Sequence, residues 1–500
     1  MMDGSIRLNP LDTAWLFTES RATPNHVGGL LTFRVPEDAP QDYMRRMMVE
    51  FREHRQFAAP WNRRLKFAFT KNPVPAWIET DDIDLEYHLR HAALPWPGGE
   101  RELGELVGRL HSTPIDLTRP PWECTLIEGL EGGRFALFIK MHHSLIDGVS
   151  GVRTLFRGFA EDANSSLALP PFWAAGAGAA SGGPKRKPRR EKQVATVAQA
   201  TEAALQALST QARSVPQLAL AFGRIIQRIG DPSAGLAVPF DAPRSVLNGR
   251  VREKRRFATQ HFPVDRMKAV AQAVGGTLND VVLALCGGAM RRFLLERGEL
   301  PDKPLTAGIP VSVRPADSED TGNAISFIVC TLGTDMDDPV ERLAAIRSSV
   351  KAAKDHVQGL PRQAMMQYTM LLMAPTIFTL LTGIGGRTPP MFNCTISNVP
   401  GPDKPLYFRG AEVLAAYPAS IVQHGQALNI TCASYNGQMN FGLTACHSSV
   451  PSVQRLAVYL AEEMRLLEVA LGTGPSPVAP AASDAPAARA RARKRVTRKA

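Results

Sequence analysis

Short apolar runs alternate with amphipathic stretches along most of this chain. Apolar runs of about four to eight residues predict strands, and apolar positions spaced three and four residues apart predict helices. In the first third of the sequence we expect strands at residues 29–35 and 135–141, and helices at 102–111 and 149–159.

The second half continues the intermixed pattern. Helices are expected at residues 194–229, 267–274, 279–297 and 452–471, and strands at 306–313, 325–332, 392–397, 428–435 and 439–446. Strands and helices intermixed in both halves predict an α/β fold with two subdomains. The length of 500 residues agrees, because a single core rarely grows that large.

Two segments interrupt this pattern. Residues 162–193 are rich in Pro, Gly, Ala and Ser and end in a basic run, and residues 473–500 are rich in Ala and Pro and end in another. Such compositions bury too little apolar surface to order themselves. We therefore expect an N-terminal subdomain at 1–161, a disordered linker at 162–193, a C-terminal subdomain at 194–472 and a disordered tail at 473–500.

Residues 365–385 form an apolar, Met-rich stretch that approaches the ~20 residues needed to cross a bilayer. Gln367, several threonines and the mid-run Pro375 weaken that interpretation. We favour a buried pair of helices broken at Pro375. The alternative is a lipid-facing element that dips into one leaflet.

Composition indicates a large soluble protein with reduced thiols. Hydrophobic residues make up 44% of the chain, which is enough to fill two cores. The six cysteines are scattered without a CxxC pair, which predicts neither a disulfide framework nor a zinc ribbon. Residues 1–5 lack the basic and apolar segments of a signal peptide, so we expect the protein on the cytoplasmic side.

The basic charge lies in the two interrupting segments. Residues 185–192 hold six Lys and Arg against one Glu, and residues 473–500 hold seven against one Asp, which accounts for the whole formal charge of +11. Polybasic segments bind anionic membrane or lipid-droplet surfaces, each Lys or Arg contributing about 1 kcal/mol. A solubilising tail without a partner is the other interpretation. Nucleic-acid binding is not expected, because neither run carries interleaved aromatic residues.

The strongest candidate for chemistry is the sequence Met-His-His-Ser-Leu-Ile-Asp-Gly at residues 141–148. It follows an apolar strand and contains two adjacent imidazoles, the side chains best able to exchange protons near neutral pH. The alternative is that both histidines are structural residues whose ring nitrogens are hydrogen-bonded within the fold. A metal site at His142, His143 and Asp147 is disfavoured, because adjacent strand residues point to opposite faces.

Six motifs in order resemble one family. The block HHxxxDG at 142–148 resembles that of CoA-dependent acyltransferases with the chloramphenicol-acetyltransferase-like fold, and five other segments narrow the resemblance to the bacterial wax ester synthase/diacylglycerol acyltransferase family. These segments are Asn-Pro-Leu-Asp at 9–12 with His-Val-Gly-Gly at 26–29, Arg-Pro-Pro-Trp-Glu at 119–123, Asn-Asp-Val-Val at 279–282, Pro-Val-Ser-Val-Arg at 310–314 with Gly-Asn at 322–323, and Ser-Asn-Val-Pro-Gly-Pro at 397–402. Pro121 stands where the family motif has leucine.

The resemblance implies two chloramphenicol-acetyltransferase-like subdomains with an active-site tunnel between them. It also implies an O-acyltransferase that takes acyl-CoA as co-substrate, needs no cofactor, and acylates diacylglycerol to triacylglycerol, long-chain alcohols to wax esters, or both. With the basic segments, this predicts peripheral association with the inner membrane face or lipid inclusions. The alternatives are a condensation-type acyltransferase that uses a carrier-protein thioester, and a non-catalytic lipid-droplet or membrane protein.

Site roles follow from the chemistry and the resemblance together. His143 is the expected general base. His142, on the opposite strand face, is expected either to orient the loop or to line the tunnel, and Gly148 to permit a close backbone approach or a positive φ. Asn279 is either an oxyanion donor or a helix N-cap, and Asp280 either caps the same helix or touches the rim of the site.

Asp147 has two possible roles. It either orients His143 as in a triad or, as the wider fold family implies, turns away and pairs with Arg314 from the second half.

Overall fold

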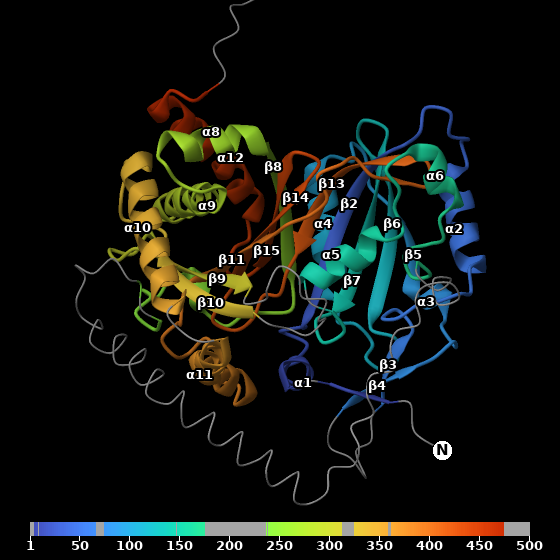
Figure 1. Ribbon diagram of the computed structural model, residues 1–500, viewed down its shortest axis with the longest axis horizontal. Coiled ribbons are helices and arrows are strands. Elements are labelled where there is room, and N and C mark those ends of the chain that lie inside the picture. The colour runs from blue at the N-terminus through green and yellow to red at the C-terminus, as the bar shows by residue number, and fades with distance from the viewer. Residues whose placement is uncertain are drawn as a thin grey trace, which may run out of the picture.

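The computed structural model describes residues 5–8, 10–66, 75–146, 148–175, 237, 239–312, 325–358 and 362–474. Within these ranges the chain forms two six-stranded mixed sheets, each covered by helices, which lie side by side (Figure 1). The expected α/β fold with two sheet-containing halves is therefore confirmed.

The first sheet has the strand order β12-β13-β2-β7-β6-β5, and only β5 and β6 are parallel neighbours. Its central strand β7 owes its position to an apolar run, since residues 135–139 are all buried. The bounds are β2 His26–Arg34, β5 Leu89–Ala93, β6 Trp122–Leu130, β7 Arg134–His142, β12 Tyr407–Phe408 and β13 Ala411–Ala419. The helices of this half are α1 Pro10–Phe17, α2 Tyr43–Glu53, α3 Leu85–His88, α4 Glu100–Ser112, α5 Gly148–Phe156 and α6 Ala163–Ala168. A small sheet of order β1-β4-β3 adds β1 Ile6–Arg7, β3 Arg63–Lys66 and β4 Ala76–Glu79.

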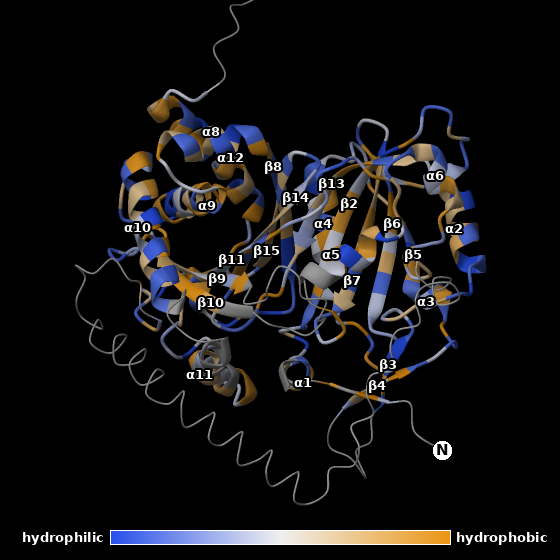
Figure 2. Cartoon of the chain, in the orientation of Figure 1, coloured by the Kyte–Doolittle hydropathy of each residue, from blue (hydrophilic) through white to orange (hydrophobic). Residues whose placement is uncertain are grey.

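The second sheet has the order β10-β9-β11-β14-β15-β8. Its bounds are β8 Arg255–Pro263, β9 Thr306–Ser312, β10 Ile325–Thr331, β11 Cys394–Val399, β14 Leu428–Tyr435 and β15 Gln438–Cys446. The helices are η3 Val246–Asn248, α8 Val264–Ala273, α9 Leu278–Leu295, α10 Pro339–Gln358, α11 Arg362–Leu381 and α12 Val453–Leu471. Helix α9 is buried along most of its length and belongs to the core of this half. Figure 2 shows the outer helices α8 and α10 alternating between hydrophilic and hydrophobic residues, as one-sided burial requires.

Helix α4 joins the two halves by a close approach to β8. A Cβ on Gly104 would lie 2.5 Å from the carbonyl oxygen of Phe257, and one on Gly108 would lie 2.9 Å from that of Arg255. Glycines four residues apart on one helix face therefore let the backbone of α4 contact the first strand of the second sheet.

The division of the chain differs from the expected one at the crossover strand β13. Residues 407–419 follow β11 in sequence, yet β12 and β13 lie in the first sheet, where β13 pairs with β2 in antiparallel register from Val413 and Phe33 to Ala419 and Gly28. The expected C-terminal subdomain 194–472 thus contributes two strands to the other half. Buried and partly exposed residues alternate along β13, as expected for a strand with one face in the core.

The expected linker also begins too early. Residues 162–168 form the capped helix α6, and Phe172 and Trp173 are fully buried in the core of the first half. Two large aromatic side chains bury enough apolar surface to order this proline-containing segment, which composition alone did not indicate. Residues 176–236, which include the rest of the linker and the expected helices at 194–229, lie outside the described residues, as do residues 475–500 of the tail.

The Met-rich stretch also differs from the favoured interpretation. Helix α11 continues through Pro375 as one helix instead of breaking there, and Phe378, Leu381 and Ile384 near its end are exposed by 60%, 56% and 37%. Across the described residues, no single helix is both long and apolar enough to span a bilayer, and α8 and α9 meet that criterion only together, as a pair bent by 95°.

Candidate active site

His143 lies in the turn that directly follows β7. The strand ends at His142, the next residues form a tight turn, and α5 begins at Gly148. The backbone N–H of His143 donates to the carbonyl oxygen of Asn25 at 2.9 Å. The apolar interior of β7 thus fixes the strand, and a hydrogen bond to the segment before β2 fixes the half-buried histidine at its end.

The imidazole of His143 stacks on the indole of Trp15 in α1. The ring centroids are 4.5 Å apart and the planes are inclined by 28°. A stacked indole limits the rotation of the imidazole ring. Trp15 therefore suits a histidine that must gain and release a proton in one orientation.

Asn25 ties α1 to the histidine turn. Its side-chain amide donates to the carbonyl oxygen of Trp15 at 2.7 Å and to Oγ1 of Thr18 at 2.9 Å, while its own carbonyl oxygen accepts from His143. Asn25 is only 2% exposed, so these bonds replace water and are costly to lose. Asn25 thus links the two elements that carry the stacked rings, through its side chain to α1 and through its backbone carbonyl to the histidine turn.

His142 has different surroundings from its neighbour. It is 1% exposed, and its Nδ1 accepts the backbone N–H of Ser144 at 3.2 Å and lies 2.7 Å from the Ser144 hydroxyl. Acceptance at Nδ1 leaves the ring proton on Nε2, which faces the carboxylate of Glu19 at 3.4 Å. His142 is thus engaged on both ring nitrogens, as expected for a residue that shapes the loop.

Further buried polar groups lie beneath the histidines. Lys140, two residues before His142, is 2% exposed and pairs with Glu123 on β6 at 3.1 Å. Beside it, Nε2 of His26 donates to the carbonyl oxygen of His111, whose own Nε2 donates to that of Ser420. Burial lowers the pKa of His111 to about 3 and that of His26 well below its usual value, and the charge of Lys140 adds to both shifts. Both imidazoles are therefore neutral structural groups.

The structure places Asn279 and Asp280 in the first turn of α9. Thr277, not Asn279, is the N-cap, so the expectation that Asn279 caps this helix is wrong; Asn279 is the second helical residue. Of the alternatives left open for Asp280, capping is observed. Its carboxylate accepts from the Thr277 backbone N–H at 2.7 Å and from the Thr277 hydroxyl at 2.8 Å. The oxyanion role of Asn279 stays a prediction.

Asp147 and Arg314 lie outside the described residues, so their pairing also stays a prediction. Gly148 is the first residue of α5. Trp122 of the Arg-Pro-Pro-Trp-Glu segment is a packing residue, since it is fully buried and its indole N–H donates to the carbonyl oxygen of Trp61 at 2.8 Å.

Sequence reasoning missed Trp15, Glu19 and Asn25. A signal was present for Trp15, because the Asn-Pro-Leu-Asp segment at 9–12 leads into the helix whose next turn carries it.

All six cysteines are buried. Burial raises the pKa of Cys394 to about 12 and raises those of Cys124, Cys286, Cys330 and Cys432. For Cys446 burial also acts upward, but hydrogen bonds with Ser448 and the neighbouring backbone outweigh it and lower the pKa. Among the described residues, no three His, Cys, Asp or Glu side chains are grouped so as to hold a metal ion.

The paired sheets define a known two-part fold. The first condensation domain of the calcium-dependent antibiotic synthetase shares it, with a TM-score of 0.56 and 17% identity over 95% of this chain and 98% of that one. The match to the wax ester synthase/diacylglycerol acyltransferase from Marinobacter aquaeolei VT8 is more specific, with a TM-score of 0.71 and 36% identity over 93% and 100% of the two chains. The architecture is thus that of an acyltransferase.

Sequence comparisons identify the family. The wax ester synthase/diacylglycerol acyltransferase catalytic domain matches residues 8–282, and the WS/DGAT C-terminal domain matches residues 321–468. A putative diacylglycerol O-acyltransferase of Mycobacterium tuberculosis is 42% identical over 94% of this chain and 99% of its own, and the O-acyltransferase WSD of Acinetobacter baylyi is 38% identical over 92% and 96%. The chain belongs to the wax ester synthase/diacylglycerol acyltransferase family, which confirms the resemblance drawn from its motifs.

Proposed function

We propose that the protein transfers a fatty acyl group from acyl-CoA to the hydroxyl of diacylglycerol or of a long-chain alcohol, with His143 as general base. The observation that carries the proposal is the setting of His143, stacked on Trp15 and held at the backbone by Asn25. Relatives named diacylglycerol O-acyltransferase, O-acyltransferase WSD and wax ester synthase support the substrate class.

The chemistry needs one proton to move twice. An alcohol is a poor nucleophile until its proton is removed, so His143 takes that proton as the oxygen attacks the thioester carbonyl. When the tetrahedral intermediate collapses, the carbon–sulfur bond breaks and the imidazolium returns the proton to the leaving thiolate. The products are an ester and free CoA, and the histidine is regenerated without a covalent acyl-enzyme.

The setting of the cysteines supports this direct transfer. A thiol nucleophile must be ionised, and burial raises the pKa of five of the six thiols. Cys446, the exception, belongs to β15 and lies beside Ser448 at 3.0 Å. Its Sγ also accepts the backbone N–H of Arg252 at 3.3 Å, just before β8. No step of the proposed reaction uses a thiol of the protein.

The decisive experiment replaces His143. With purified protein, acyl-CoA and either diacylglycerol or hexadecanol, His143→Ala should lower CoA release by about 10²–10⁴-fold, the usual effect of losing a general base. Its melting temperature should stay near that of the wild type, because the residue is only half-buried. His91→Ala, on the partly exposed face of β5, is the matched control and should retain full activity. Near-wild-type turnover by His143→Ala would reject the mechanism.

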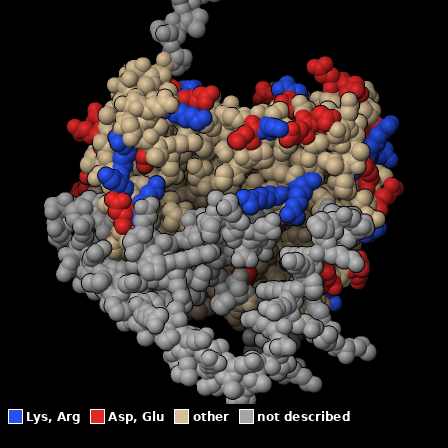
Figure 3. Space-filling view, viewed as in Figure 1, with Lys and Arg blue, Asp and Glu red and all other residues tan. Residues whose placement is uncertain are grey.

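We also propose that the protein associates peripherally with an anionic membrane or lipid-inclusion surface through its basic segments. On the face in Figure 3, basic and acidic side chains are interspersed along the upper rim, whereas residues 185–192 and 473–500 account for the net charge. The exposed Phe378 and Leu381 of α11 supply an apolar contribution.

Deleting residues 473–500 should reduce co-sedimentation with anionic liposomes at low salt, and raising the ionic strength should reduce it for the intact chain as well. A tail of equal length with its Lys and Arg replaced by Gln is the control for length and should bind like the deletion. Binding that responds to neither manipulation would reject electrostatic attachment and point to α11.

A further inference from the structure

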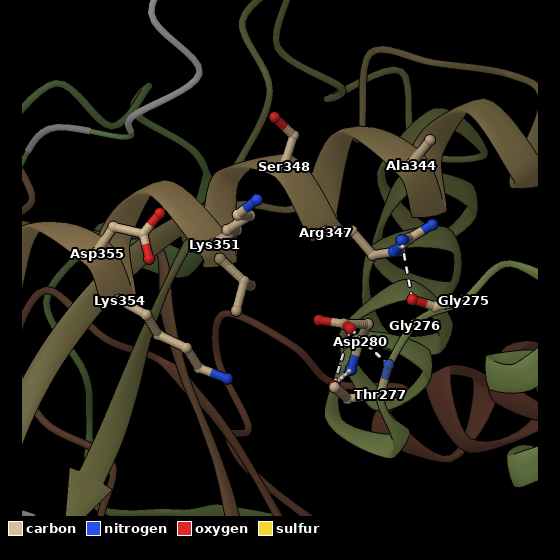
Figure 4. Close-up of a pocket in the computed structure, with 11 residues that line it drawn as sticks. Gly275, Gly276, Thr277, Asp280, Ala344, Arg347, Ser348, Lys351, Lys354 and Asp355 are labelled. Carbon is tan, nitrogen blue, oxygen red and sulfur yellow. Dashed lines mark hydrogen bonds between the residues drawn. The ribbon is translucent and has the colours of Figure 1, made fainter. Parts of the chain in front are cut away.

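A cavity of about 480 Å³ lies between the first turn of α9 and one face of α10 (Figure 4). Residues 344, 347, 348, 351, 354 and 355 line it from α10, a spacing of three and four residues that places them on one face of the helix. Residues 275–277 and Asp280 line it from the other side. The cavity is within the range of roughly 300–1,000 Å³ typical of sites for small organic molecules and is larger than a single phosphate ion requires.

Three cationic side chains line one wall of the cavity. Arg347 is fixed in place, since its guanidinium donates to the carbonyl oxygens of Val274 and, at 3.0 Å, of Gly275. A Cβ on Gly276 would lie 3.1 Å from Cδ of Arg347, so this glycine allows the arginine to lie against the loop. Within the described part of the chain, no carboxylate forms an ion pair with Lys351 or Lys354.

The three cations repel one another. Arg347 and Lys351 are four residues apart and Lys351 and Lys354 three apart on one helix face, a spacing at which like charges destabilise a helix. Asp355, four residues after Lys351 on the same face, offsets only part of the charge of the three cations. A bound anion would offset this repulsion and form charge-assisted hydrogen bonds with the cationic groups that it contacts. The amides at the start of α9 contribute less, because Thr277 and Asp280 already cap each other.

The cavity also presents carboxylates, from Asp280 and Asp355. Carboxylates accept hydrogen bonds from hydroxyl and amino groups. A ligand that combines anionic oxygens with such donors fits this arrangement better than an inorganic anion or a fatty acid does. Phosphates attached to a sugar and an amino-bearing base have this combination.

We propose that the cavity between α9 and α10 is a binding site for a phosphorylated nucleoside. Two sources share that chemistry, the nucleotide end of acyl-CoA and a free nucleotide. If the ligand is the nucleotide end of acyl-CoA, the inference rests on the acyl-CoA chemistry proposed above. If the ligand is a free nucleotide, the inference does not depend on that chemistry.

Direct binding tests the site. Titration calorimetry on the full chain should detect adenosine 3′,5′-bisphosphate more tightly than adenosine or inorganic phosphate. The double variant Lys351→Gln/Lys354→Gln should weaken bisphosphate binding about tenfold or more, since it removes two charge-assisted contacts. Lys268→Gln, which removes a lysine paired with Asp265 on α8, is the matched control and should bind like the wild type. Equal affinity of the double variant and the wild type, or bisphosphate binding no tighter than that of inorganic phosphate, would overturn the site.

Kinetics separate the two sources. If the cavity holds the donor, the double variant should raise KM for acyl-CoA about tenfold while kcat stays within about twofold, because the lysines would bind ground and transition states alike. An unchanged KM together with weakened bisphosphate binding would assign the cavity to a free nucleotide. If even the wild type fails to turn over acyl-CoA, the proposed function fails, yet the titration still decides whether the site exists.

Discussion

Among the described residues, each half of the molecule has a Lys or Arg side chain paired with a Glu side chain where both are less than 10% exposed, and the two pairs lie in different kinds of structure. In the first half, Lys140 and Glu123 are directly opposite each other on β7 and β6, inside the sheet, with exposures of 2% and 6%. In the second half, Arg342 of α10 and Glu463 of α12 are equally buried but join two helices outside the sheet. The pairs match in chemistry and burial and differ in what they position.

The difference indicates which of the two buried ion pairs positions the candidate active site. Nζ of Lys140 also donates to the carbonyl oxygens of Leu110 and Thr113, so it fixes the end of α4 against the strand that carries His142 and His143 two and three residues later. Arg342 donates to the carbonyl oxygen of Met336 near its own helix. Since a buried pair is weak evidence for net stability, we infer that the Lys140 pair serves to hold the candidate catalytic turn in place.

Breaking the pair of Lys140 and Glu123 should have the largest effect on stability and turnover. Lys140→Met leaves the carboxylate of Glu123 buried with only Arg90 at 3.4 Å and the Tyr87 hydroxyl at 3.1 Å as partners. The free energy of unfolding should fall by about 3–5 kcal/mol. Turnover per folded molecule should fall about tenfold to 10²-fold, because small displacements of a catalytic group are costly. Urea unfolding and CoA release measure the two losses.

The matched control breaks the second pair. Arg342→Met should lower the free energy of unfolding by a similar amount, about 3 kcal/mol, while kcat stays within about twofold of the wild type. Adding Glu123→Leu to Lys140→Met should recover part of the lost stability, since the buried carboxylate that has lost its closest cation is then removed as well. If Lys140→Met and Arg342→Met reduce turnover equally, the inference that the first pair positions the turn is wrong.

The local sequence pattern predicted those helices and strands whose own residues carry the whole signal. The expected strand at 428–435 coincides with β14, and the expected helices at 279–297 and 452–471 differ from α9 and α12 by one or two residues. Strands β6 and β13 were missed for different reasons. Glu123 breaks the apolar pattern of β6, and its charge is compensated by Lys140 opposite it on β7. Strand β13 gains its structure from β2, almost 400 residues earlier in the sequence.

In the candidate site, too, the local sequence identified one residue but not the partners that come from other segments. His143 was identified from its own motif, because imidazole chemistry follows from residue type and from the strand before it. The partners that orient it were not identified. Trp15, Glu19 and Asn25 come from a separate helix and loop, and their side chains carry no local mark of function. Asn279 shows the opposite error, in which a polar residue near a helix start suggested a cap that Thr277 provides.

The stability of the fold should also depend on pH, with opposite signs in the two halves. His26 and His111 lie beside Lys140, and burial holds the pKa of His111 at about 3 in the folded state. Below pH 6.5 the unfolded chain takes up protons that the folded chain does not, so stability is lost as the pH falls from about 6.5 toward 3. The slope is at most about 1.4 kcal/mol per pH unit for each histidine. Burial raises the pKa of Glu463, despite its partner Arg342, so that group loses stability in the other direction, as the pH rises through its folded pKa.

Melting curves of three variants between pH 5 and 7.5 test these signs. His111→Gln, which retains a donor for the carbonyl oxygen of Ser420, should flatten the loss of stability on the acid side. Glu463→Gln should leave that slope unchanged and reduce the loss on raising the pH. His91→Gln, on the partly exposed face of β5, is the control for removing any imidazole and should change the acid slope less than His111→Gln does. If His111→Gln still loses stability with falling pH as steeply as the wild type does, the imidazoles around Lys140 do not cause the acid sensitivity of the first half. The buried polar groups of the two halves would then differ in position alone.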